Sequence, residues 1–194
     1  MSVKKRDNLS ISPWIDRFSG LIHEAGAVLD LAAGSGRHSR WLLDRGFSVT
    51  AVDRETEALR ALAAEKRVQS GPSRRGALEV IEADLEDGSP WPLAERRFDG
   101  IIVVNYLWRP LFPAILNALD EGGVLLYETF AVGQEALGRP SNPDFLLRPG
   151  ELVEVVAGRL TVIAYEHGQI EGQAGPAVKQ RIAATRRDKP LPLP

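Results

Sequence analysis

The chain has 194 residues, with 24 basic and 26 acidic side chains, a net charge of −2 and no cysteine. This length suits one domain with a substantial core, and the near balance of charge gives no general attraction to nucleic acid or anionic membranes. The lack of cysteine excludes disulfides, thiol nucleophiles and cysteine-bound zinc, and three scattered histidines give no metal-ligand spacing. Residues 1–13 carry no secretory signal and no apolar run is long enough to span a membrane, so we expect a cytoplasmic enzyme without a membrane partner.

Strand-like and helix-like patterns alternate along the chain, which predicts a mostly parallel sheet covered by helices on both faces. A short segment with a capping helix is expected at 1–26, a main domain at 27–187, a mobile tail at 188–194, and a loop at 70–73. Helices are expected from 13 onward, at 37–45, 56–67, 107–119 and 150–157. Strands are expected at 27–31, 48–53, 78–82, 98–104, 160–166 and 178–184, the last two as an antiparallel hairpin across a glycine-rich loop at 168–175.

The junction between the first strand and the following helix holds the most informative motif, Asp30-Leu31-Ala32-Ala33-Gly34-Ser35-Gly36. Gly34 and Gly36 allow a tight turn and close approach of a ligand to the backbone. The helix that follows offers unpaired N–H groups and its positive dipole end to a carboxylate or phosphate. The motif predicts a loop that binds a nucleotide cofactor.

Two positions indicate which cofactor this loop binds. A dinucleotide fingerprint requires a third glycine where this chain has Ser39. Asp30 lies inside the strand end, where a carboxylate suits a cofactor with a positive amino group, which nicotinamide dinucleotides lack. An alternative role for Asp30 is a hydrogen bond to neighbouring backbone at the base of the loop.

Further polar side chains follow the next three strands. Asp53 ends the strand at 48–53, where an acid accepts hydrogen bonds from both ribose hydroxyls, although a helix cap is the simpler alternative. Asp84 directly follows the strand at 78–82, within a loop rich in acids. Asn105 and Tyr106 follow the strand at 98–104, at the edge where open sheets bind ligands. For Tyr106, substrate binding and packing against the next helix are equally favoured alternatives.

These motifs, together with the glycine turn and strand within 119–128, resemble those of the class I S-adenosylmethionine-dependent methyltransferases. The resemblance implies a doubly wound, Rossmann-like sheet of seven strands with the last antiparallel and helices on both faces. It also implies in-line transfer of the methyl group of S-adenosylmethionine, and residues 29–53 look most like the small tellurite-resistance-type enzymes, which act on small soluble acceptors. The cofactor contacts expected from the resemblance are Asp30, Ala32, Gly34, Gly36, Asp53, Arg54, Asp84, Leu85 and Asn105.

The residues that bind the acceptor and any general base are less constrained by the sequence. Tyr106, Glu128, Arg139 and His167 are the candidates for a catalytic role. The long segment 131–148 is expected to form a lid whose Arg139 and Arg148 meet an anionic acceptor. His38 is either structural or close to the cofactor. An RNA or protein methyltransferase of the same fold and a nicotinamide-dependent oxidoreductase with a degenerate loop remain the alternatives.

Overall fold

The computed structural model describes residues 11–70, 76–172, 175–187, 191 and 193–194. Residues 1–10 of the expected N-terminal segment, residues 71–73 of the expected loop, and residues 188–190 and 192 of the expected tail lie outside the described residues.

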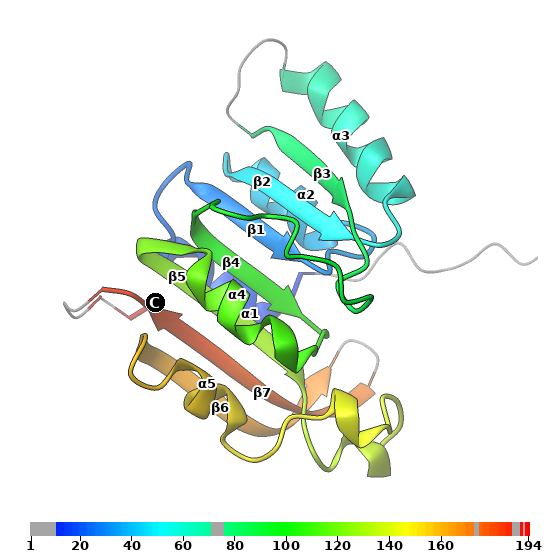
Figure 1. The fold of residues 1–194 in the computed structure, drawn as a ribbon, viewed down its shortest axis with the longest axis vertical. Helices are drawn as coiled ribbons and strands as arrows, with labels where there is room; N and C mark the ends of the chain where they lie inside the picture. The colour runs from blue at the N-terminus through cyan, green and yellow to red at the C-terminus, as the bar shows by residue number, and fades with distance from the viewer. Residues whose placement is uncertain (1–10, 71–75, 173–174, 188–190, 192) are drawn as a thin grey trace, which may run out of the picture.

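In the described part of the chain, seven strands form one sheet in the order β3-β2-β1-β4-β5-β7-β6 (Figure 1). Strands β1 to β5 pair in parallel, whereas β7 runs antiparallel to both β5 and β6. The expected doubly wound sheet with an antiparallel last strand is confirmed. The strands are β1 (Ala27–Leu31), β2 (Ser48–Asp53), β3 (Leu78–Glu82), β4 (Phe98–Val104), β5 (Leu119–Phe130), β6 (Thr161–Gly172) and β7 (Gly175–Thr185).

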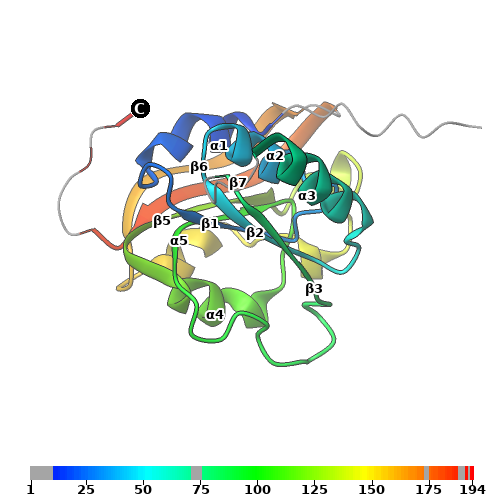
Figure 2. The ribbon, with the colours of Figure 1, turned by 90° about the horizontal axis from the view of Figure 1, so that it is seen from above.

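Helices cover both faces of this sheet. Helices α1 (Pro13–Phe18), α2 (Arg37–Asp44) and α3 (Glu57–Ser70) lie on one face, and α4 (Phe112–Asn117) and α5 (Glu151–Val156) lie on the other (Figure 2). Local sequence explains several boundaries. The Ser12 hydroxyl accepts a hydrogen bond from the Trp14 N–H while Pro13 takes the first helical position, and Gly46 follows α2 with a φ of 86°.

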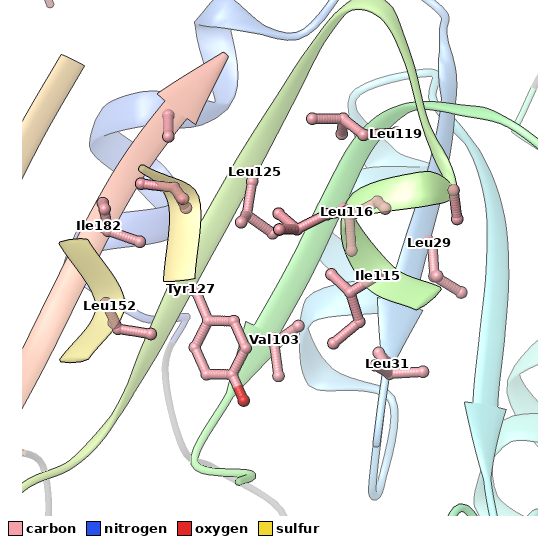
Figure 3. Packing of buried hydrophobic residues seen from close by; sticks show 14 of the residues in the cluster. Leu29, Leu31, Val103, Ile115, Leu116, Leu119, Leu125, Tyr127, Leu152 and Ile182 are labelled. Atoms are coloured by element: carbon pink, nitrogen blue, oxygen red, sulfur yellow. The ribbon is translucent and has the colours of Figure 1, made fainter. Parts of the chain in front are cut away.

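Two apolar layers hold the helices against the sheet. On the α4 and α5 face, Ile115, Leu152 and Tyr127 belong to one cluster with side chains from β1, β4 and β7 (Figure 3). On the opposite face, Trp14 and Phe18 of α1 are buried in a second cluster with strand residues. The indole N–H of Trp14 also donates to the Ile182 carbonyl at 3.2 Å, so α1 is part of the main core.

Two expected elements differ from the structure. Residues 168–172 and 175 of the expected glycine-rich loop belong to the paired strands β6 and β7, with Gly172 opposite Gly175, and residues 173–174 lie outside the described residues. The helix expected at 107–119 is reduced to a 3-10 turn, Arg109–Leu111, followed by α4, and Leu119 already begins β5. Prolines at 110 and 113 each remove a backbone donor, and pairing of Leu119 with Phe98 takes that residue into the sheet.

Candidate functional site: two adjoining cavities

The site lies where the carboxyl ends of the parallel strands meet, next to the β1–β4 pair at which the strand order reverses. A cavity of about 460 Å³, which we call the strand-tip cavity, opens there. Six of the nine expected cofactor residues line it, together with Tyr106. The full lining comprises Ala32, Asp53, Arg54, Glu55, Ala83, Asp84, Leu85, Glu86, Asn105, Tyr106 and Phe145.

Asp53 is held firmly at the wall of the strand-tip cavity. One carboxylate oxygen, Oδ2, accepts from the Gly34 N–H at 2.7 Å, and Oδ1 accepts from the Glu55 N–H at 2.9 Å. The first bond ties the loop after β1 to the tip of β2. Each carboxylate oxygen keeps a further lone pair for hydrogen bonds from a ligand.

The glycines in the loop after β1 serve different purposes. Gly34 has a φ of 58° and nothing within 4 Å of the place where a Cβ would be, so the backbone is open there. At Gly36, the φ of 80° favours glycine, and a Cβ would also lie 2.7 Å from the Leu59 side chain of α3. Ala32 also has a positive φ of 54°, a strained conformation that an alanine in the sequence does not predict.

Asp30 lies beneath this loop and is not among the described residues that line the strand-tip cavity. Its side chain is buried and its Oδ2 accepts a hydrogen bond from the Ser39 hydroxyl at 2.6 Å. Burial raises the pKa of Asp30 to about 7, although the Ser39 bond and Arg37 act against this rise. Ser39, which breaks the dinucleotide pattern, therefore partners Asp30. Contact of Asp30 with a cofactor amino group stays a prediction.

Tyr106 lies between the strand-tip cavity and the core. Its carbonyl accepts a hydrogen bond from the Tyr127 hydroxyl at 2.8 Å, which fixes the backbone just after β4. Burial, followed by the nearby carboxylates Glu86 and Asp84, raises the pKa of the Tyr106 phenol. Tyr106 is therefore a neutral phenol at physiological pH, suited to hydrogen bonding and unsuited to acting as a base.

A second cavity of about 180 Å³, which we call the hairpin cavity, is formed by the starts of α1 and α2, the end of β5 and the β6–β7 hairpin. Glu128 lies in its wall and is 4% exposed. The Glu128 carboxylate is 3.3 Å from Lys179 Nζ and 3.6 Å from Arg181 Nε. The full lining comprises Ser12, Pro13, Arg37, Asn105, Glu128, Phe130, Ile170, Glu171, Gly172, Gly175, Ala177, Lys179 and Arg181.

Asn105 lines both cavities and is the residue at which they adjoin. It has a φ of 59°, a conformation that asparagine tolerates better than most residues. Its backbone N–H donates to the Glu128 carbonyl at 2.9 Å, and its side-chain Oδ1 accepts from Lys179 Nζ at 2.6 Å. Backbone and side chain of Asn105 are thus both fixed by the end of β5 and by β7.

Segment 131–148, expected to be an unstructured lid, is anchored instead. It contains two 3-10 turns, Gln134–Ala136 and Pro143–Phe145, and the Gln134 side chain accepts from the Val178 N–H at 2.9 Å. Arg109 donates to the carbonyls of Asp144 at 2.7 Å and Leu146 at 2.9 Å, and its Nε lies 2.7 Å from buried Glu151. The sequence showed the turn residues but not these tertiary anchors. Phe145 of this segment lines the strand-tip cavity.

The expected anion-binding arginines do not line either cavity in the described structure. Arg139 is exposed, and the exposed Arg148 lies 3.5 Å from Glu151 and 3.4 Å from Glu154. His167 is exposed on the edge strand β6 and is likewise absent from both linings. The hairpin cavity is instead lined by other cations, chiefly Lys179 and Arg181. They were missed in the sequence because they lie within a strand pattern that carries no motif.

His38 has a structural partner. It is buried, and its Nε2 accepts a hydrogen bond from the Ser12 N–H at 3.3 Å, which joins α2 to the start of α1. Burial lowers the pKa of His38 to about 3, with further lowering by Arg37 and Lys179. His38 is therefore neutral in the folded protein at physiological pH.

No cluster of three or more histidine, cysteine, aspartate or glutamate side chains is arranged to hold a metal ion among residues 11–70, 76–172 and 175–187. None of the helices that the structure describes is both long and apolar enough to cross a membrane.

Known proteins resemble this chain in both sequence and fold. The family model for methyltransferase domains matches residues 28–123. A Bacillus subtilis protein named "Putative methyltransferase YqeM" is 27% identical over 124 residues, which are 59% of this chain and 47% of that protein, so the match spans about half of the relative's length.

Solved structures extend the likeness to nearly the whole chain. TehB from Haemophilus influenzae gives a TM-score of 0.71 at 18% identity, covering 94% of this chain and 65% of TehB. A Burkholderia thailandensis 1,6-didemethyltoxoflavin-N1-methyltransferase, solved with 1,6-didemethyltoxoflavin and S-adenosylhomocysteine, gives 0.62 at 19% identity, covering 90% of this chain and 76% of that one. At these identities the structural likeness shows the fold.

Proposed function

Since the chain belongs to the class I S-adenosylmethionine-dependent methyltransferase superfamily, we propose that it transfers a methyl group to a small-molecule acceptor. The observation that carries this proposal is the pair of adjoining cavities at the carboxyl edge of the sheet, joined at Asn105. One cavity has the size and the acids for a nucleoside cofactor, and the other is small and enclosed by the hairpin.

The size of the strand-tip cavity and its hydrogen-bond acceptors suit S-adenosylmethionine. The Asp53 carboxylate, oriented by the Gly34 N–H, suits the ribose hydroxyls, and Asp84 with Leu85 suits the amino group and face of adenine. The open backbone at Gly34 leaves room for the rest of the cofactor beside the loop. When bound, S-adenosylmethionine supplies a methyl group whose carbon–sulfur bond breaks, leaving the electron pair on sulfur, as a bond forms to the acceptor's nucleophilic atom.

Because the cofactor supplies the reactive group, the main role of the protein's residues is to position the two reactants. Segment 131–148, anchored by Arg109 and Gln134, places the apolar side chain of Phe145 at the cavity wall. Asn105 is fixed between the two cavities by Lys179. A general base is required only if the acceptor is protonated at working pH. Neither neutral Tyr106 nor Glu128, which two cations engage, is well suited to that task.

Calorimetric titration with S-adenosylhomocysteine and with NADP tests the proposal directly. We expect S-adenosylhomocysteine to bind and NADP not to bind. Asp53→Ala should weaken S-adenosylhomocysteine about tenfold to a hundredfold, because charge-assisted hydrogen bonds contribute about 1.5–3 kcal/mol.

Asp53→Asn is the matched control, since asparagine can still accept from the Gly34 N–H but carries no charge. Its affinity should lie between those of the wild type and Asp53→Ala. Binding of NADP without binding of S-adenosylhomocysteine would contradict the proposed activity, and unchanged affinity in a folded Asp53→Ala would move the ribose contact elsewhere.

A further inference from the structure

The hairpin cavity concentrates positive charge in a largely buried place. Arg37, Lys179 and Arg181 line it, against the carboxylates of Glu128 and of Glu171, and Glu171 is exposed. Lys179 is 9% exposed and the Arg181 side chain 13% exposed, whereas strand-tip carboxylates such as Asp84 and Glu86 are open to solvent. Buried charge is costly unless a partner of opposite sign matches it closely.

The buried carboxylate of the cavity does not fully pair its buried cations. Glu128 is the one buried carboxylate in the described lining, and each of its oxygens serves a different cation, Lys179 at 3.3 Å and Arg181 at 3.6 Å. Arg181 Nε is buried and makes no hydrogen bond to any residue that the structure describes. A second carboxylate near Arg181, Glu166 at 3.5 Å, is half exposed and lies outside the lining.

The pKa shifts of these groups reflect chiefly the burial of their charges. Burial lowers the pKa of Lys179, and the neighbouring cations Arg181 and Arg37 lower it further, while Glu128 acts in the opposite direction. Burial also lowers the pKa of Arg37 in spite of Glu128 and Asp30. An anion in this cavity would give the buried Arg181 Nε a partner of opposite charge.

Apart from Ser12 and Asn105, the uncharged part of the lining is apolar or glycine. Pro13 comes from α1, Phe130 from the end of β5, and Ile170 and Ala177 from the two strands of the hairpin. Lys179 Nζ lies 5.1 Å from the centre of the Phe130 ring, so the apolar and cationic parts of the wall are contiguous. The volume of about 180 Å³ is below the range of about 300–1,000 Å³ typical of sites for drug-sized ligands.

We propose that the hairpin cavity binds the methyl acceptor, and that this acceptor is a small organic anion whose carboxylate or similar group meets Arg181 and Lys179 while its apolar body packs on Phe130 and Ile170. The inference rests on the proposed function, because it takes the strand-tip cavity as the cofactor site. It replaces Arg139 and Arg148, which the sequence favoured, with cations that line a cavity.

Binding of benzoate and of its neutral counterpart benzamide to protein saturated with S-adenosylhomocysteine tests the inference. We expect benzoate to bind at least about tenfold more tightly than benzamide, since a charge-assisted hydrogen bond contributes about 1.5–3 kcal/mol. Arg181→Gln should remove this preference while leaving the affinity for S-adenosylhomocysteine within about twofold of the wild type. Arg97→Gln, which removes an exposed arginine bonded only to the Arg96 carbonyl among described partners, is the matched control and should change neither.

A second readout needs no variant and covers the case in which Arg181→Gln does not fold. Addition of benzoate to the wild type should shift the backbone amide resonances of Phe130 and Ala177. Equal affinity for benzoate and benzamide, or shifts confined to residues outside the hairpin cavity, would overturn the inference while S-adenosylhomocysteine binding is intact. Failure of S-adenosylhomocysteine to bind would overturn the proposed function, so the two failures are distinguishable.

Discussion

The two cavities on either side of Asn105 are built in opposite ways. Apart from Phe145, the strand-tip cavity is lined by residues at or just after the ends of β1, β2, β3 and β4, and most of its charged side chains are acidic. The hairpin cavity gathers Pro13, Arg37, Glu128 and Lys179 from distant parts of the chain, and its Glu128 lies largely buried between Lys179 and Arg181. The first depends on local motifs at strand ends; the second depends on the packing of the whole fold. Substitutions in the second should therefore cost more stability than those in the first.

The largest effect is expected at Glu128. Glu128→Ala leaves Lys179 and Arg181 buried without their shared carboxylate, and breaking a buried ion pair destabilises a protein by about 3–5 kcal/mol. Glu166→Ala removes the half-exposed partner of the same Arg181 and should cost less than about 1 kcal/mol. Urea unfolding of both variants measures the difference. Similar losses in the two would show that the hairpin cavity is not electrostatically distinct from the surface.

The next effect concerns the pH dependence of stability, which depends on the two buried groups Asp30 and His38. Asp30 has a pKa of about 7 when folded against 3.8 otherwise, so its charging destabilises the fold as pH rises from about 4 to about 7. His38 has a pKa of about 3 when folded against 6.5, so its contribution to stability is lost as pH falls from about 6.5 towards 3. The two groups therefore change the free energy of unfolding with pH in opposite directions, each by at most about 1.4 kcal/mol per pH unit. In the wild type these two changes offset each other.

Single variants separate these slopes. Asp30→Asn leaves only the effect of His38, so stability should fall more steeply on acidification from pH 6.5 to 4. His38→Gln leaves only the effect of Asp30, so stability should rise on acidification over the same range. Unfolding free energies measured at several pH values test this. Parallel pH profiles for the wild type and both variants would show that neither group titrates differently in the folded and unfolded protein.

A smaller effect is expected where segment 131–148 meets the strand-tip cavity. Arg109→Ala removes the bonds to Asp144, Leu146 and buried Glu151, and should cost about 1–3 kcal/mol because donors to buried acceptors are lost. Affinity for S-adenosylhomocysteine should fall a few-fold as Phe145 loses its support. Arg148→Ala, which removes a largely exposed partner of the same Glu151, is the control and should change stability by less than about 1 kcal/mol. Equal effects of the two would mean that Arg109 does not hold the segment in place.

The contrast between the cavities also explains what the sequence could predict. The mostly parallel sheet, the closing hairpin and the polar residues at strand ends follow from short apolar runs and the residues directly after them, whereas the doubly wound arrangement of seven strands was implied by the family resemblance. The role of Ser39 as partner of Asp30, the strain at Ala32 and the anchors on segment 131–148 depend on side chains that meet only after folding. Lys179 and Arg181 alternate with Gln180 along β7, a pattern that by itself indicates no more than an exposed strand face.

The smallest effect is expected at Arg139, which the sequence offered as an anion contact. Its side chain is exposed and does not line either cavity in the described structure. Arg139→Ala should alter stability, S-adenosylhomocysteine affinity and benzoate affinity each by less than about 0.5 kcal/mol. A marked loss of benzoate binding in this variant would indicate that segment 131–148 contributes to the acceptor site after all.

The central claim is that the strand-tip cavity holds the cofactor and leaves the hairpin cavity for the acceptor. A crystal structure of the protein with S-adenosylhomocysteine tests this most directly. We predict density for the ribose at Asp53, for adenine at Asp84 and Leu85, and for the sulfur end near Asn105, with the space between Phe130 and Arg181 still open. Density for the nucleoside within the hairpin cavity, or ribose hydroxyls away from Asp53, would contradict the account.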